Sequence, residues 1–119
     1  MRSFRILGLF LLCLSAVAMA SENKMGIHDT SRVSFSSSVR VGSTVLPAGE
    51  YVVRHTMEGQ DHVMNFQRVG NKEVFKVKCT LVPLPKKAQR DETIFEITSG
   101  NERVVHELIF SGDTAKHVF

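Results

Sequence analysis

From Arg32 onwards, apolar and polar residues alternate along the chain, and turn-forming residues interrupt the alternation roughly every eight to twelve positions. Successive side chains of a β-strand point to opposite faces, so a period of two indicates strands with one buried face. The clearest case is residues 73–82, where lysines at 76 and 78 alternate with apolar residues. We expect the lysines to face water and the apolar set to face the core; that set is Phe75, Val77, Cys79 and Leu81.

Further segments also have the composition of strands, with turn residues between them. They are residues 33–41 with a bend at 36–38, 44–46, 51–57, 62–69, 93–98, 103–110 and 115–119. The loop at 58–61 has Gly59 where a positive φ is easiest. Residues 83–91 form the longest predicted loop, because their two prolines cannot donate to a strand ladder. The pattern predicts an all-β fold, an antiparallel β-sandwich or distorted barrel of seven or eight strands.

The domain organisation follows from the same pattern. Residues 31–119 are expected to form a single β-rich domain, because no linker or repeat divides them. Residues 21–30 are polar and have no period, so we interpret them as a loose N-terminal lead. Within this lead, Ile27 is the one candidate for a contact with the fold.

The first twenty residues have a different character. Arg2 and Arg5 precede an apolar run, and Ala18-Met19-Ala20 supplies the small residues of a signal-peptidase site. The run is about 15 residues long, shorter than the roughly 20 residues that span a bilayer. We therefore predict a signal peptide at 1–20, cleaved between Ala20 and Ser21. The protein is then exported, either periplasmic or secreted, and does not span a membrane.

Removal of this segment changes the charge and the cysteine count. The full chain has a net charge of +3, and loss of Arg2 and Arg5 lowers it to about +1. Such a small charge does not favour nucleic-acid binding. Cys13 also leaves with the signal peptide, so Cys79 has no partner for an intramolecular disulfide.

Two short motifs resemble a family of small exported bacterial β-sandwich proteins of unknown function. Residues 45–53, Val-Leu-Pro-Ala-Gly-Glu-Tyr-Val-Val, contain the leucine-proline-alanine-glycine turn that leads into a tyrosine-containing strand in that family. Residues 108–113 and 117–119 resemble its C-terminal ending, an aromatic strand, a glycine turn and a last short strand. The resemblance implies a compact β-sandwich and no catalytic residues. The chain departs from the family pattern in its basic central loop and its histidine-rich sheet.

Candidate catalytic residues are few. Cys79 is predicted on the apolar face of a strand, where a buried thiol is inert by default. The serines at 34 and 36–38 lack the sequence context of a nucleophile elbow. Asp91 and Glu92 are neighbours, and neighbouring strand residues point to opposite faces. We therefore predict no catalytic site and no enzyme.

The histidines form two candidate pairs for metal binding. The register set by the 58–61 loop places His55 and His62 diagonally across adjacent strands, about 7–8 Å apart. A loop at residues 111–114 would likewise place His106 and His117 diagonally across the two strands of the last hairpin. Without a third ligand either pair is more consistent with ordinary strand residues, so we predict no metal site and no cofactor. The candidate third ligands are Asp61 and Met57.

Lys86, Lys87 and Arg90 form a basic cluster in the 83–91 loop, with Lys76 and Lys78 as possible neighbours. This loop is a candidate interaction site for an envelope protein or an anionic polymer. The leading hypothesis is a non-enzymatic interaction or structural module of the bacterial cell envelope. A small ligand-binding or metal-binding module is the alternative, and an enzyme of unknown type comes third. The sequence makes no prediction of oligomeric state.

Overall fold

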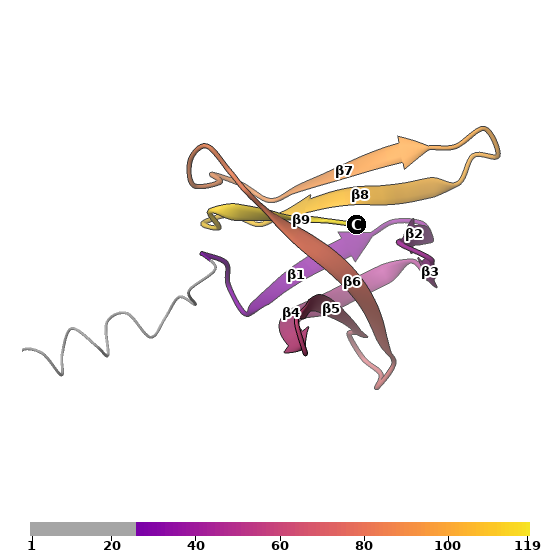
Figure 1. The fold of residues 1–119 in the computed structure, drawn as a ribbon. Coiled ribbons are helices and arrows are strands. Elements are labelled where there is room, and N and C mark those ends of the chain that lie inside the picture. The colour runs from indigo at the N-terminus through magenta and orange to yellow at the C-terminus, as the bar shows by residue number, and fades with distance from the viewer. Residues whose placement is uncertain (1–25) are drawn as a thin grey trace, which may run out of the picture.

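The computed structural model describes residues 26–119, which form nine β-strands joined by turns and loops (Figure 1). The predicted signal peptide and the Ala20–Ser21 cleavage site lie outside the described residues. In the part of the chain that the structure describes, no helix is long and apolar enough to cross a membrane. The strands are β1 (Thr30–Phe35), β2 (Val39–Val41), β3 (Thr44–Leu46), β4 (Gly49–Glu58), β5 (Asp61–Arg68), β6 (Val74–Pro83), β7 (Glu92–Ile97), β8 (Arg103–Ile109) and β9 (Ala115–Val118).

The strands form one continuous sheet that folds into two leaves. Its order is β1-β4-β5-β6-β9-β8-β2-β3, and β7 pairs with the other side of β8. Residues 74–79 of β6 pair with β5, and residues 80–83 pair with β9. Figure 1 shows β6 crossing diagonally from the leaf of β1, β4 and β5 to the leaf of β7, β8 and β9. Because the sheet does not close on itself, the arrangement is the sandwich-like form of the prediction and not a barrel.

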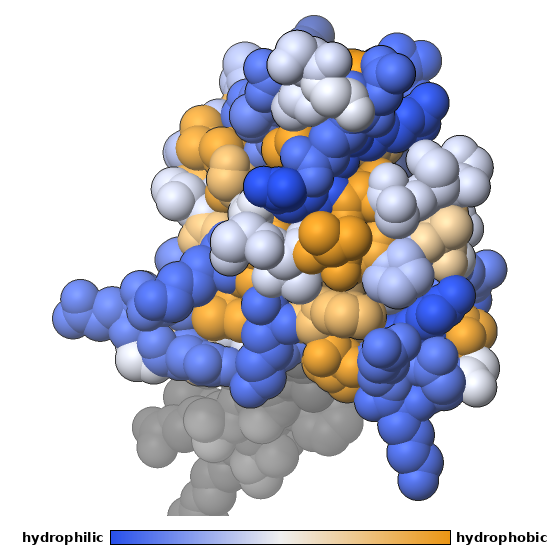
Figure 2. All heavy atoms as spheres, turned by 90° about the vertical axis from the view of Figure 1, so that its right-hand side faces the viewer, coloured by the Kyte–Doolittle hydropathy of each residue, from blue (hydrophilic) through white to orange (hydrophobic). Residues whose placement is uncertain are grey.

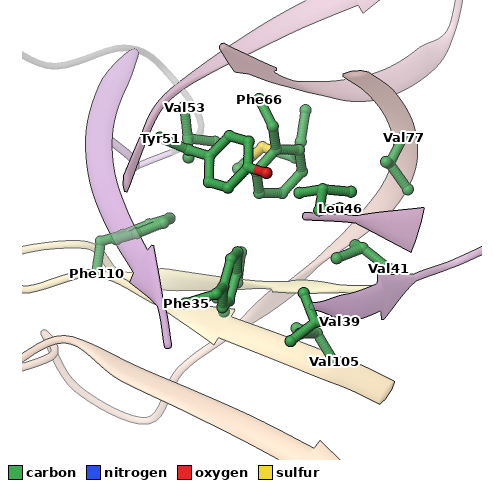
Figure 3. Close-up of a cluster of buried hydrophobic side chains, with 12 residues drawn as sticks. Phe35, Val39, Val41, Leu46, Tyr51, Val53, Phe66, Val77, Val105 and Phe110 are labelled. Atoms are coloured by element: carbon green, nitrogen blue, oxygen red, sulfur yellow. The ribbon is translucent and has the colours of Figure 1, made fainter. Parts of the chain in front are cut away.

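The core lies between the two leaves. Figure 3 shows Tyr51 and Phe66 of the first leaf lying across from Phe35 and Val105, with the valines of β2 beside them. Tyr51 contacts the rings of Phe35, Phe66 and Phe75 at centroid distances of 5.9–6.3 Å. Each buried large apolar side chain stabilises the fold by about 1.5–3 kcal/mol. The alternation of apolar and polar residues therefore supplies one buried face to each leaf.

The all-β prediction is confirmed, as is the register of the β4–β5 hairpin. Glu58 lies opposite Asp61 and His55 opposite Met64 in the ladder, and Gly59 has a φ of 64°. On β6 the predicted alternation is also present, with Val77 buried and Lys76 and Lys78 exposed. Local pattern and turn chemistry are sufficient for these features, because both act within a few residues.

The structure has nine strands where seven or eight were expected, and the difference arises at the serine bend. Residues 33–41 were expected to form a single bent strand, but Ser36–Ser38 separate β1 from β2 completely. β1 pairs with β4 in the first leaf, while β2 pairs with β3 and β8 in the second. The β2–β8 pair is parallel, in contrast to the antiparallel arrangement predicted throughout. A period of two gives the same sequence pattern in both cases, so it does not distinguish them.

The described part of the N-terminal lead, residues 26–30, packs against the domain. The side chain of Ile27 is 1% exposed, so these residues are not loose and Ile27 is buried in the fold. The Gly26 carbonyl oxygen accepts hydrogen bonds from the Thr114 main-chain nitrogen at 2.7 Å and from its hydroxyl at 3.1 Å. The lead therefore reaches the turn before β9 at the opposite end of the sequence.

Candidate functional site

β7 is an open edge of the sheet with apolar side chains on its surface. Within the described residues it pairs with β8 alone, so its other edge presents main-chain donors and acceptors. The exposed fraction is 41% for Ile94, 40% for Phe95 and 62% for Ile97. On the face that Figure 2 displays, hydrophobic side chains reach the surface in patches among hydrophilic ones. An exposed apolar edge of this kind is able to receive a further strand.

The other two open edges, β1 and β3, are protected in the ways common to natural sheets. β1 carries the exposed Arg32, whose guanidinium forms an ion pair of 2.6 Å with Glu50. β3 has only three residues, too few for a long ladder. Charged side chains and short strands both discourage edge-to-edge pairing. Among the edges that the structure describes, β7 is the one that combines length with exposed apolar residues.

The basic loop lies beside the start of β7. Residues 84–90, together with Glu92 and Ile109, line a cavity of about 480 Å³. The Ala88 main-chain nitrogen donates to the Asp113 carbonyl oxygen and the Gly112 nitrogen donates to the Ala88 carbonyl oxygen, at 2.9 and 2.8 Å. These hydrogen bonds join the loop to the β8–β9 turn at Ala88, while Lys86 and Lys87 are exposed.

The basic side chains predicted to cluster at this loop do not all lie in it. Lys86 and Lys87 are exposed, and the Arg90 guanidinium pairs with the Glu92 carboxylate at 3.1 Å. Lys76 and Lys78, possible neighbours in the sequence analysis, instead pair with Glu58 and Asp61 of the β4–β5 hairpin at 3.0 and 3.3 Å. The basic cluster is therefore confined to the loop itself.

His55 and His62 come together as the hairpin register predicts. Their ring nitrogens, Nε2 of His55 and Nδ1 of His62, are 3.0 Å apart, and their ring centroids are 5.1 Å apart. The proposed third ligands do not join them: Asp61 is paired with Lys78, and the Met57 side chain is 46% exposed.

The predicted pairing of His106 with His117 is not observed. The ladder between β7 and β8 shifts after Ile94, because β8 has an extra residue, His106, that lacks a partner on β7. Such a bulge turns a side chain toward the other face. The His106 ring is exposed and its Nε2 lies 2.7 Å from the Glu96 carboxylate. His117 is 1% exposed and packs beside His55, at a ring-centroid distance of 6.0 Å.

Two residues outside the predicted pairs complete a buried polar cluster around His117. Cys79 Sγ lies 3.9 Å from His117 Nδ1, and Asp113 Oδ2 lies 4.0 Å from His117 Nε2. The other Asp113 oxygen, Oδ1, accepts hydrogen bonds from the His28 main-chain nitrogen at 3.0 Å and is 2.6 Å from His28 Nδ1. Asp113 is 0% exposed, and its Oδ2 has no hydrogen-bond partner among the described residues.

Burial governs the protonation of this cluster. Burial, together with the charges of His55 and His62, lowers the pKa of His117 to about 4. Burial also lowers the pKa of His55 and raises the pKa of the Cys79 thiol to about 11. For Asp113 burial raises the pKa, and the hydrogen bonds from His28 oppose the shift. His55, His117 and Cys79 are therefore uncharged at neutral pH. Within residues 26–119, no three His, Cys, Asp or Glu side chains already converge on one metal position.

The role of Asp113 escaped the sequence analysis, because Ser111-Gly112-Asp113 is also an ordinary turn sequence. The pairing of Cys79 with a histidine was missed for a similar reason: the period-two pattern places it on the inner face but does not identify its neighbours.

Comparisons of the chain with protein-family models, with curated proteins and with solved structures found no match.

Proposed function

We propose that this chain is an exported, non-enzymatic interaction module that binds an extended segment of a partner protein along the open edge of β7. The proposal rests on the exposed side chains of Ile94, Phe95 and Ile97 on β7. This strand pairs with β8 along one edge, and no described strand pairs with its outer edge. Added strands gain affinity from main-chain hydrogen bonds and specificity from alternate side chains.

The basic loop favours one direction for the bound segment. A strand that adds antiparallel to β7 runs from Ile97 towards Glu92, so its C-terminal end arrives beside Lys86, Lys87 and the loop cavity. The exposed Lys86 side chain at that position attracts a negative charge. We therefore propose that the partner segment has alternating apolar residues and ends with an acidic side chain or a C-terminal carboxylate.

Export is part of the same proposal. It is supported by the two arginines, the apolar run and the small residues of positions 1–20. The motif at residues 45–53 supports membership of the family of small exported β-sandwich proteins. The partner is then a protein of the cell envelope or the extracellular medium.

The states of Cys79 and His106 both favour a non-enzymatic role. A thiol with a pKa of about 11 carries little thiolate at neutral pH, so Cys79 is a poor nucleophile. The exposed His106 ring is hydrogen-bonded to Glu96. Among the described residues, no hydrogen bond joins this ring to a serine or a cysteine.

Site-specific photo-crosslinking in the organism that makes the protein tests the proposal. A benzophenone amino acid replaces Phe95 or Ile97 in separate variants, and Val45 in a matched control. Val45 is an exposed apolar residue of β3, with an exposed fraction of 54%. We expect the β7 variants to crosslink one protein several-fold more than the control. Mass spectrometry of the crosslinked peptide should identify an apolar segment with an acidic C-terminal side.

A second pair of substitutions distinguishes strand binding at the β7 edge from nonspecific contact with exposed apolar residues. Ile97→Lys places a charge on the exposed edge and should reduce the crosslink at Phe95, while Val45→Lys should leave it unchanged. Equal crosslinking from Val45, crosslinks to copies of this chain alone, or no crosslink at all would overturn the proposal.

A further inference from the structure

We propose that His55, His62, His117 and Cys79 form a Zn²⁺-binding site between the two leaves, with Asp113 as a positioning residue for His117. These residues lie on β4, β5, β6 and β9, apart from the β7 edge. Imidazole nitrogen and cysteine sulfur are the ligands that Zn²⁺ prefers in proteins.

The sheet brings these four side chains into one row. His55 is on β4, His62 on β5, Cys79 on β6 and His117 on β9, which are consecutive strands in the sheet order. His62 and Cys79 are direct cross-strand partners. His117 lies opposite Leu81, two positions along β6 from Cys79. The row crosses the point where β6 passes from one leaf to the other, so both leaves contribute ligands.

The separations are close to those of a tetrahedral zinc site. With Zn–N bonds of about 2.0–2.1 Å and a Zn–S bond of about 2.3 Å, two ligand nitrogens lie about 3.3 Å apart and a nitrogen and a sulfur about 3.6 Å apart. His55 Nε2 and His62 Nδ1 are 3.0 Å apart, and Cys79 Sγ and His117 Nδ1 are 3.9 Å apart. The structure therefore contains two ligand pairs, each with nearly the required spacing.

The two pairs are also near each other. Rings that share one tetrahedral metal have centroids about 5 Å apart. The His55–His62 distance is 5.1 Å and the His55–His117 distance is 6.0 Å. The four ligand atoms do not converge on one point within the described residues, so metal binding requires the His55–His62 pair and the Cys79–His117 pair to move towards each other. His62 and Cys79 are only partly buried, so a metal ion has access from solvent.

Asp113 lies next to His117 with one carboxylate oxygen unsatisfied. Its Oδ2 is fully buried, has no hydrogen-bond partner among the described residues and lies 4.0 Å from His117 Nε2. A histidine ligand commonly donates its second ring N–H to a carboxylate, which fixes the tautomer and the ring orientation. With Nε2–H directed at Asp113, the lone pair of Nδ1 is on the side of Cys79.

The experiment is a titration of the purified protein, prepared without a histidine tag, with Zn²⁺ and with Co²⁺. We expect one ion per chain and a submicromolar Kd for Zn²⁺. Co²⁺ should give the visible bands of a tetrahedral complex and a near-ultraviolet thiolate charge-transfer band. The band reports the sulfur ligand directly in the unmodified protein, so the test does not depend on any variant folding.

Variants then assign the ligands. Cys79→Ser should abolish the charge-transfer band, and His55→Ala with His62→Ala should remove tight binding. Asp113→Asn should weaken Zn²⁺ binding about 10–100-fold while the thiolate band remains, which distinguishes positioning from ligation. His106→Ala is the matched control, since His106 is exposed and paired with Glu96. Weak binding of several ions, a Co²⁺ spectrum without a thiolate band, or loss of binding in the His106 control would overturn the proposal.

Discussion

The hydroxyl of Tyr51 donates a hydrogen bond of 2.5 Å to the carbonyl oxygen of Pro47, four residues earlier in the chain. This bond closes the turn that connects β3 with β4. Gly49, the first residue of β4, has a φ of 150°, and the Tyr51 ring continues into the core between Phe35 and Phe66. The proline-alanine-glycine turn is therefore fastened to the core by the tyrosine that follows it.

Tyr51→Phe should lower the free energy of unfolding by about 1–2 kcal/mol. The ring remains in the core, while the Pro47 carbonyl loses its donor in a partly buried position. Urea unfolding followed by circular dichroism measures the change. Phe66→Leu is a useful comparison, because it leaves this hydrogen bond intact and alters core packing alone. An unchanged midpoint in Tyr51→Phe would show that the hydroxyl contributes nothing to stability.

The metal-free protein should become less stable as the pH falls from about 6.5 to 4, and His117 should be a main cause. Its pKa is about 4 in the folded state, so the unfolded chain binds a proton more readily over this range. When the pH is low enough to protonate His117 fully in the folded state, this one group has lowered the free energy of unfolding by about 3 kcal/mol. The groups that face it are His55, His62, Cys79 and Asp113, and the raised pKa of Asp113 acts in the opposite direction.

The effect of His117 is isolated by comparison with His117→Gln. Unfolding free energies are measured in urea at pH 7 and pH 4.5 in the presence of a chelator. The wild-type protein should lose more stability between the two pH values than the variant does. Parallel losses in the two proteins would contradict a neutral, buried His117.

Cys79 should react slowly with thiol reagents in the folded protein. Burial raises the pKa of the thiol to about 11, and the half-buried side chain packs against the core cluster. We expect alkylation by iodoacetamide at pH 8, followed by mass spectrometry, to be at least tenfold slower in buffer than in denaturant. Equal rates would place the thiol at the surface.

Limited trypsin digestion should cut first after Lys86, Lys87 or Arg90. Lys76 and Lys78 are also exposed, but their main chain lies in β6, which pairs with β5 along residues 74–79. A protease needs several residues of extended, unpaired main chain, which the loop supplies more readily than a sheet strand. Early cleavage after Lys76 or Lys78 would show that the β5–β6 ladder opens before the loop does.

Much of the fold is predictable because its determinants are local. Alternation identifies the buried face of β6, and the glycine turn at 59 sets the register of β4 with β5. The contact between His55 and His62 follows directly from that register. Each of these features depends on residues within a few positions of one another, so the amino-acid sequence alone is sufficient to determine it.

The remaining features depend on which segments meet in the folded molecule. The serine bend sends β2 to a parallel pairing with β8, and the bulge in β8 turns His106 outward. His117 joins Cys79 and His55 because β6 crosses between the leaves, and Asp113 meets His28 across 85 positions of sequence. The packing energy between segments distant in the sequence decides these contacts. The alternation of apolar and polar residues along a strand does not depend on which strand pairs with it, so it cannot identify the neighbour. For this reason the sequence shows which side chains face inward, while the tertiary structure alone assembles them into a cluster.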